Sequence, residues 1–330
     1  MDNLAHSLAG WALSEAGLKK KTGLATATLV LAANLPDVDV LGLLFNENLA
    51  WRRGWTHGPI AMLILPPLLV AGLIWFDQWQ SRRGTRPADR PPLHRGWLII
   101  LAYLGWFSHP FLDFLNTYGI RLLMPFSDRW FYGDTLFIID LWLWLALGFG
   151  VWRARRRQRA GVAHPGRPAL VALGITLAYI GAMGASSVAA EKMARDAAEA
   201  RGLGPVRTIV ASPVPINPFK RDIVFANDAA YGFGEVNWLH SPMLTLSSRL
   251  TPHHMDDPAI TEARNAKPIR DFLYWSRLPM ARVERSPSKT RVTLSDARYS
   301  YGAANPAFSQ QINLPPIPRG QHLPRSANSP

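Results

Sequence analysis

The chain has 330 residues, which is enough for two domains, and it contains no cysteine. Disulfides and thiolate metal sites are therefore excluded, so a bound metal would need histidine and carboxylate ligands. Much of the excess positive charge, formally +13, lies in short basic clusters that flank apolar segments, as cytoplasmic loops of membrane proteins do. We therefore predict a membrane protein, with the lipid bilayer as its partner and no nucleic acid as a stable partner.

The first 190 residues contain about six apolar segments. Residues 4–18 are short for a span of about 20 residues, so a marginal crossing and an interfacial position both stay open. Residues 22–45 are interrupted at Asn34–Asp39, where a proline beside two acids indicates a helix end or a broken helix buried in protein. Further spans are predicted at Ile60–Phe76, Trp97–Asn116, Leu136–Trp152 and Ala169–Ala190.

The basic clusters predict the orientation of these segments. Lys19–Lys21, Arg82–Arg95 and Arg153–Arg167 are assigned to the cytoplasmic side because positive loops stay inside. Following the chain through six crossings then brings all the ionisable candidates to the outer leaflet, where a single site is expected. These candidates are His6, Asp37, Asp39, His57, His109, Asp113, Asp134 and Asp140.

The stretch Gly105–Gly119 carries the central pair of this predicted site. His109 and Asp113 are four residues apart, so they lie one turn apart on the same helix face. Ionisable side chains inside a membrane segment are costly and usually mark an ion, a proton path or a partner. A purely structural hydrogen-bonded pair is the alternative.

The other candidates are weaker when taken alone. Asp37 and Asp39 project from a turn and suit a cation, but solvated loop acids look the same. His6 and His57 also fit uninvolved histidines near a terminus and at an interface. Asp134 and Asp140 are about 120° apart around a helix, so one is expected to bind the metal and the other to support it.

Two arginines are candidates for substrate binding. Arg53 and Arg129 can bind the phosphate group of a substrate through bidentate hydrogen bonds, or they can be plain interfacial anchors. The sequence has no G-x-S-x-G, Walker or H-E-x-x-H motif. Metal-activated water is therefore the expected chemistry, with Asp37 and Asp113 as catalytic carboxylates.

After Ala190 the composition becomes polar and rich in proline. Short strands are predicted from alternation and turn residues. They are Val206–Val210, Asp222–Ala226, Val236–Leu239, Ala281–Glu284, Arg291–Leu294 and Ala307–Leu314. The predicted fold is thus an all-α polytopic membrane domain over 1–190, a small β-rich extracytoplasmic domain over 191–314, and a disordered tail over 315–330.

Several strings together resemble the bacterial membrane-bound metal-dependent hydrolases of the YdjM/YbcI type. They are Met1–Ser7, Asn34–Asp39, Arg53–His57 and Ser108–Asp113 running on to Leu122–Pro125. The chain differs at Arg52 and Val40, where many members carry histidine. This resemblance implies a bacterial inner-membrane location, a metal and hydrolysis, without naming a substrate.

A more distant similarity is to the zinc-dependent phospholipase C and nuclease superfamily. His6, Asp37 and His57 occur in the same order there, followed by a His-x-x-x-Asp pair such as His109 and Asp113. This similarity implies phosphodiester cleavage in a helical fold with zinc, although manganese or magnesium also suits these ligands. The preferred function is hydrolysis of a phosphoester in a lipid or lipid-linked substrate. The rivals are a transporter of divalent cations or protons and a scaffold with a structural metal.

Overall fold

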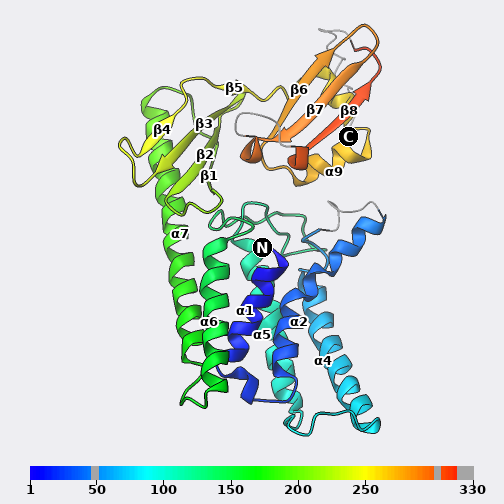
Figure 1. Ribbon diagram of the computed structural model, residues 1–330. Coiled ribbons are helices and arrows are strands. Elements are labelled where there is room, and N and C mark those ends of the chain that lie inside the picture. Colours follow the sequence, from blue (N-terminus) through cyan, green and yellow to red (C-terminus); the bar gives the residue numbers. More distant parts are fainter. Residues whose placement is uncertain (46–51, 301–305, 318–330) are drawn as a thin grey trace. The chain divides into compact units, whose positions relative to one another are not determined.

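The structure is a computed structural model that describes residues 1–45, 52–300 and 306–317 (Figure 1). The chain divides into two compact units. The first consists of Met1–Ala189 together with Ser212–Lys220, and the second consists of Ala190–Ala211 with the chain from Arg221 onward.

The first unit is helical, as predicted. Its helices are α1 (Asn3–Glu15), α2 (Ala25–Asn34), α4 (Pro59–Arg82), α5 (Arg95–Phe114), α6 (Leu141–Arg159) and the greater part of α7 (Arg167–Ala200), with short 3₁₀ stretches η1 (Leu18–Lys20) and η2 (Leu35–Phe45). Within the described residues, α4, α5 and α7 are long and apolar enough to cross a membrane. The prediction of an all-α membrane part is confirmed.

Local chemistry explains where several of these helices begin and end. The Asp2 carboxylate accepts hydrogen bonds from the amides of Leu4 and Ala5 and so caps α1. The interruption predicted at Asn34–Asp39 is the junction at which α2 ends and η2 begins. Pro36 follows this junction closely, and a proline cannot donate the hydrogen bond that would continue the helix.

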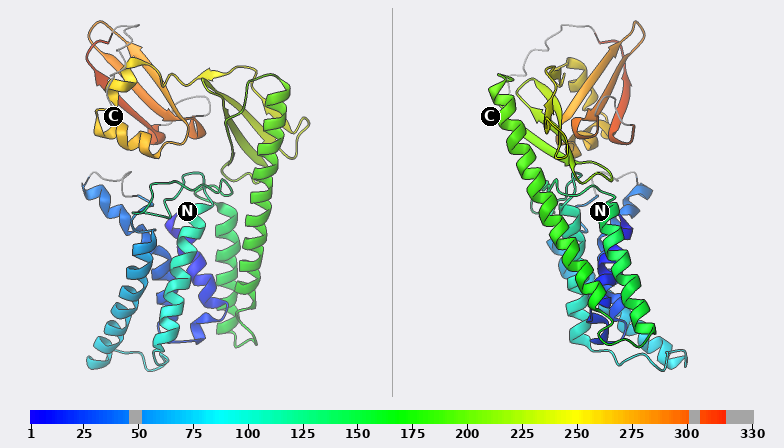
Figure 2. Two further views of the ribbon diagram at one scale, coloured as in Figure 1. Left: turned by 180° about the vertical axis from the view of Figure 1, so that it is seen from behind. Right: turned by 60° about the vertical axis from the view of Figure 1, so that its left-hand side comes forward.

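Two glycines let α1 and α5 approach α2 closely (Figure 2). A Cβ atom added to Gly10 of α1 or to Gly105 of α5 would lie 2.7 Å from the Leu29 carbonyl oxygen of α2. His6 precedes Gly10 by one turn and His109 follows Gly105 by one turn. The glycine contacts therefore bring the two histidines together at the end of α2.

The second unit contains two small sheets. The first has the order β1 (Thr208–Pro213), β2 (Lys220–Ala226), β3 (Ala230–Asn237), β4 (Leu244–Leu246), with β5 (Thr251–Pro252) also paired to β3. The second is an antiparallel sheet of β6 (Pro279–Arg285), β7 (Thr290–Asp296) and β8 (Ser309–Leu314). All six predicted strands occur, with shifted ends, while β4, β5 and the helices α8 (Pro258–Ala263) and α9 (Lys267–Trp275) were not predicted.

Helix α7 is longer than the predicted segment, which ended at Ala190. Its last part presents Ala190, Ala194 and Ala198 at four-residue spacing to a core that contains Ile223 and Phe225 of β2. Small side chains on one face let a sheet pack directly against a helix. The helix therefore continues past the apolar segment because it also forms part of the core of the second unit.

A buried ion pair stabilises the second unit at the end of β7. Asp296 accepts hydrogen bonds from the guanidinium of Arg298 and from the hydroxyl of Ser276, and both charged side chains are fully buried. Burial alone would raise the pKa of Asp296, but the charge and hydrogen bonds of Arg298 and the hydrogen bond of Ser276 outweigh it and lower the pKa to about 2.

The beginning of the predicted tail is bonded to the second unit. The amide of Ile317 donates to Thr290 Oγ1 at 2.9 Å, and its carbonyl accepts from Arg285. Residues 318–330, to which the rest of the tail prediction applies, lie outside the described residues. Short 3₁₀ turns, η3 (Ala297–Tyr299) and η4 (Pro306–Phe308), precede β8.

Candidate metal centre

The C-terminal end of α5 provides the centre of the site. His109 and Asp113 are both fully buried, and His109 Nε2 lies 3.5 Å from Asp113 Oδ2. The other ring nitrogen of His109, Nδ1, lies 2.7 Å from the Ala33 carbonyl oxygen of α2. Because a carbonyl only accepts, Nδ1 is the donor in this contact, and Nε2 is the ring nitrogen that faces the cluster. This is the usual way in which a protein orients a metal-binding histidine.

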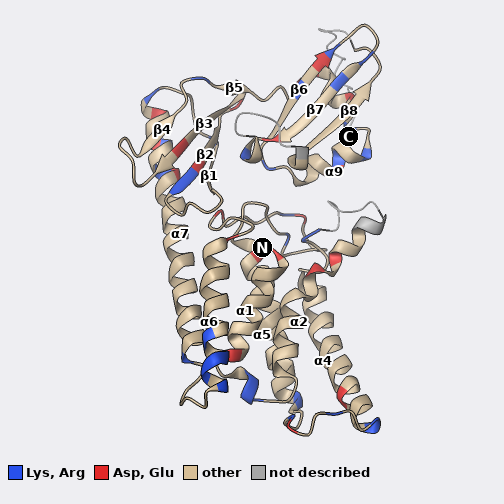
Figure 3. Cartoon of the chain, in the orientation of Figure 1, with Lys and Arg blue, Asp and Glu red and all other residues tan. Residues whose placement is uncertain are grey.

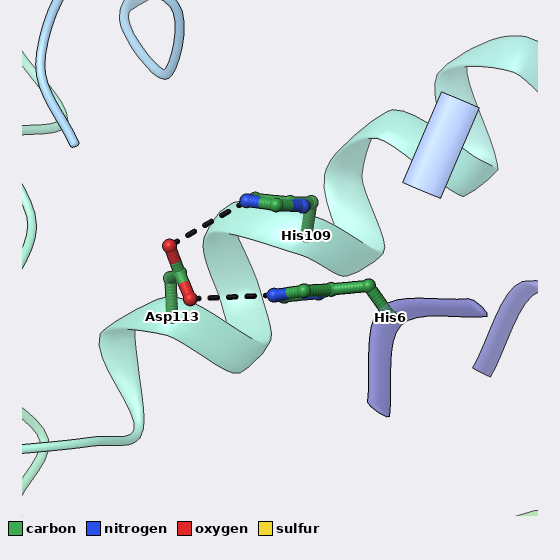
Figure 4. Close-up of side chains that lie close together, drawn as sticks. All are labelled: His6, His109 and Asp113. Atoms are coloured by element: carbon green, nitrogen blue, oxygen red, sulfur yellow. Dashed lines mark ion pairs between the residues drawn. The ribbon is translucent and has the colours of Figure 1, made fainter. Parts of the chain in front are cut away.

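His6 comes from α1 and lies against the same pair (Figure 4). Its ring stacks on that of His109, with a centroid distance of 3.7 Å, and its Nε2 lies 3.4 Å from Asp113 Oδ1. The side chain is fully buried, yet neither ring nitrogen has a hydrogen-bond partner in the part of the chain that the structure describes. The α-amine of Met1 also contacts Asp113 Oδ1.

His57 approaches from the loop that precedes α4. Its Nε2 lies 3.1 Å from His109 Nε2 and 3.4 Å from Asp113 Oδ2, while Thr56 Oγ1 lies 3.0 Å from its Nδ1. Burial lowers the pKa of His57 to about 4, against smaller raising effects of Asp113. The ring is therefore neutral at physiological pH, which is the form that binds metals.

Asp37 and Asp39 reach the same cluster from η2. Asp37 Oδ1 lies 3.7 Å from His109 Nε2, and Asp39 Oδ2 accepts a hydrogen bond of 2.7 Å from the backbone amide of Arg53. The second oxygen of each carboxylate is buried and has no hydrogen-bond partner within residues 1–45, 52–300 and 306–317. Burial raises the pKa of Asp39, and the Arg53 amide opposes that rise.

The guanidinium of Arg53 lies against the same oxygen of Asp113 that His57 and His109 approach. Its Nε lies 3.2 Å from Asp113 Oδ2 and its Nη1 donates to Asn116 Oδ1 at 2.8 Å, while the guanidinium packs over the ring of Tyr118. Arg53 is only 3% exposed. The guanidinium therefore lies within the cluster, where it offsets the charge of Asp113.

The ligand atoms form two overlapping groups within the described residues. One group is His6, His109 and Asp113, and the other is Asp37, His57 and His109. In each, one nitrogen or oxygen per residue lies within 4.8 Å of the others. Buried polar atoms are nearly always hydrogen-bonded in proteins. A bound cation would explain why the ring nitrogens of His6 and one oxygen of each aspartate have no hydrogen-bond partner among the described residues.

The remaining predicted site residues have other contacts. Asp140 caps α6 through the Leu143 amide and accepts from the Tyr179 hydroxyl, so both of its oxygens are used. The Asp134 carbonyl accepts from Ser187 of α7. Arg129 is exposed and packs over the Phe131 ring. None of the three belongs to the two groups of ligand atoms.

Two supporting residues were missed from the sequence. Asn116 is fully buried and binds Arg53, and Thr56 contacts His57. In the predicted helix Trp97–Asn116, Asn116 follows Asp113 by three residues and shares its face, which was a usable signal, although α5 itself ends at Phe114. The partner of Thr56 depends on the fold of its loop and had no such signal.

The sequence profile of the YdjM inner membrane protein family matches residues 1–190. The match covers more than half of the chain and includes every residue of the buried cluster. No curated protein and no solved structure matches the chain significantly. The chain belongs to the YdjM inner membrane protein family.

Proposed function

We propose that this member of the YdjM inner membrane protein family is a metal-dependent hydrolase that cleaves a phosphoester in a lipid or lipid-linked substrate. The observation that carries the proposal is the buried cluster around His109 and Asp113. Its histidine nitrogens and carboxylate oxygens converge, and several of them have no hydrogen-bond partner. Such an arrangement is costly without a cation and favourable with one.

The residues present fit a divalent metal. His6, His109 and Asp113 would hold one ion, and Asp37 and His57 would share His109 or hold a second ion, with Asp39 beside them. Nitrogen and carboxylate donors suit zinc best, and they also accept manganese or magnesium. A bound divalent ion supplies Lewis acidity, which lowers the pKa of water and offsets negative charge on a phosphoryl group.

The chain's own residues have distinct proposed roles. The Ala33 carbonyl fixes the tautomer of His109, and Arg53 with Asn116 fixes Asp113. Asp37 is the most accessible of the clustered carboxylates, with 17% of its side chain exposed, and its Oδ2 has no hydrogen-bond partner among the described residues. Asp37 is therefore the proposed general base that takes a proton from the attacking water, and Asp113 is the central ligand.

Apolar side chains next to the cluster favour a lipid substrate. Val38, Val40 and Leu41 of η2 are exposed, although they stand beside the half-buried Asp37 and the buried Asp39. An apolar surface adjoining a polar site suits a molecule with a polar head and an acyl tail. Arg129 is exposed and remains the proposed contact for the substrate phosphate.

The charge distribution supports an outer location of the site. Lys and Arg gather at the end of the first unit away from Met1, while the cluster lies at the end near Met1 (Figure 3). Basic loops stay on the cytoplasmic side. We therefore place the site at the outer surface, with the C-terminal unit extracytoplasmic.

The test compares purified protein loaded with zinc, with manganese and after chelation. Phospholipids, lipid-linked phosphates and model phosphodiesters are offered, and product release is followed. We expect turnover only when metal is bound. The His109→Ala variant should lose turnover, and the His164→Ala variant should keep it, because His164 is exposed and outside the cluster. Asp37→Asn should reduce turnover by about 10²- to 10⁴-fold while the ion held by His6, His109 and Asp113 remains bound. Metal flux into proteoliposomes without cleavage of any substrate would instead favour a transporter. Bound metal with neither flux nor cleavage would favour a scaffold with a structural metal.

A further inference from the structure

A second polar cavity lies at the basic end of the helical unit. It has a volume of about 530 Å³ and is lined by Trp11, Glu15, Lys19, Arg155, Gln158 and Arg159 among others. Trp11 and Glu15 are one turn apart on α1, and Arg155 and Arg159 are one turn apart on α6. Residues at this spacing share a helix face, so two facing helices supply the walls.

The charges in this cavity are unevenly paired. Lys19 contacts both the Glu15 carboxylate and the Gln158 side-chain oxygen, so the one acid of the cavity already has a partner. Neither Arg155 nor Arg159 makes an ion pair with a described carboxylate. Two positive charges are therefore left without a counter-ion in the described part of the chain.

Arg155 is also held in place before any ligand arrives. Its guanidinium carbon lies 5.1 Å from the centre of the Trp11 ring, within the range of a cation–π contact. The Trp11 ring therefore lies next to the guanidinium of Arg155, and both side chains line the cavity. A guanidinium edge matches two oxygens of a phosphate, and holding it in advance reduces the entropy lost on binding.

We propose that this cavity binds the phosphate group of an anionic phospholipid headgroup. Arg155 and Arg159 donate to the phosphate oxygens, Trp11 lies at the level of the headgroups, and Lys19 is restrained by Glu15. Basic pockets between membrane helices bind anionic headgroups in this way. The site is separate from the histidine cluster, with which it shares no residue, and it does not depend on the proposed hydrolysis.

Free phosphate offers the same chemistry, so the experiment separates the two sources. Full-length protein in detergent is titrated with phosphatidylglycerol, phosphatidylcholine of the same chains, or inorganic phosphate, and bound ligand is measured by native mass spectrometry. Phosphatidylglycerol should bind most tightly. Displacement of this lipid by millimolar inorganic phosphate would keep the phosphate site but assign it to the free anion.

Two variants with opposite expected effects make the test decisive. Arg155→Ala with Arg159→Ala should weaken phosphatidylglycerol binding by about 25-fold, at about five-fold for each arginine. Glu15→Gln releases Lys19 and should tighten binding by about five-fold.

The matched control removes the same charge from the same helix outside the cavity. Arg153→Ala with Arg156→Ala should change binding by less than about two-fold, since neither side chain lines the cavity. Equal losses in the cavity variant and the control would overturn the proposal, because the effect would then be a general one of surface charge. No change in Glu15→Gln, or weaker binding, would overturn it as well.

Discussion

Replacing Arg53 with Gln should destabilise the protein strongly after chelation and much less when metal is bound. The Arg53 side chain is 3% exposed and that of Asp113 is 1% exposed, and their charged atoms are 3.2 Å apart. With an effective dielectric constant of about 20, the attraction between unit charges at this distance is about 5 kcal/mol. Removing one partner of a buried ion pair typically costs about 3–5 kcal/mol, because the other charge is left uncompensated.

That cost depends on what else neutralises Asp113. In the chelated protein Arg53 is the principal cationic side chain at Asp113, so the apparent melting temperature should fall by about 10 °C, at about 2–4 °C per kcal/mol for a unit of this size. A divalent ion held by His6, His109 and Asp113 would offset the same carboxylate. The loss in the loaded protein should therefore be less than half as large.

The assay is thermal unfolding of the purified variants in detergent, each measured after metal loading and after chelation. Arg129→Gln is the matched control, because Arg129 is exposed and outside the cluster. A surface change of this kind should stay within about 0.5 kcal/mol in both states. An equal loss for Arg53→Gln with and without metal would refute the reasoning, since Asp113 would then gain no compensation from a cation.

Three further predictions concern the rest of the chain. The pKa of Asp296 is lowered from 3.8 to about 2, so the ionised carboxylate contributes about 2 kcal/mol to the free energy of unfolding above about pH 4 and loses this contribution as the pH falls toward 2. Asp296→Asn should therefore reduce the melting temperature of the second unit at pH 6. The difference from the wild type should shrink at pH 2. Gly105→Ala puts a Cβ 2.7 Å from a carbonyl oxygen of α2 and should lower the melting temperature by the equivalent of about 1–3 kcal/mol. The control is Gly72→Ala, because a Cβ there meets nothing within 4 Å; the melting temperature of this variant should be unchanged or slightly raised. Because the chain has no cysteine, an introduced cysteine can report which side of the membrane it is on. Ser288→Cys should react with an impermeant thiol reagent on intact spheroplasts, and Ser81→Cys should not. The reverse pattern would overturn the proposed orientation.

The fold was largely predictable because its signals are local. Long apolar runs mark helices, and alternating short segments between prolines and glycines mark strands. The extension of α7 to Ala200 was missed because its last ten residues are polar and alanine-rich, so the apolar run ends before the helix does. The strands β4 and β5, of three and two residues, are too short to carry a pattern.

The proximity of the candidate ligands was predictable for a different reason. Helix spacing and the positive-inside rule predict the depth of a side chain in the membrane, and the predicted depth is the same for His6, Asp37, His57 and the α5 pair. Depth does not give the direction in which a side chain points around its helix axis. Asp140 stands at the start of a helix, where capping competes with metal binding, and only the packing of the helices separates the two roles.

The role of Arg53 also needed the three-dimensional structure. Its sequence context next to a histidine and an aromatic belt fitted both an anion binder and an interfacial anchor. The structure instead places its guanidinium against Asp113 and Asn116. The backbone of Arg53 has a positive φ of 53°, a conformation that sequence patterns do not predict for arginine.

The metal content of the purified protein tests the central claim most directly. Protein purified in detergent, without chelators or affinity resins that carry metal, is analysed for zinc, manganese and magnesium beside the His109→Ala and His164→Ala variants. We predict at least one divalent ion per chain in the wild type and in His164→Ala. The His109→Ala variant should lose most of the bound metal, because both groups of ligand atoms include His109. Wild-type protein that holds no divalent ion after incubation with each metal, or a His109→Ala variant that holds as much as the wild type, would contradict it.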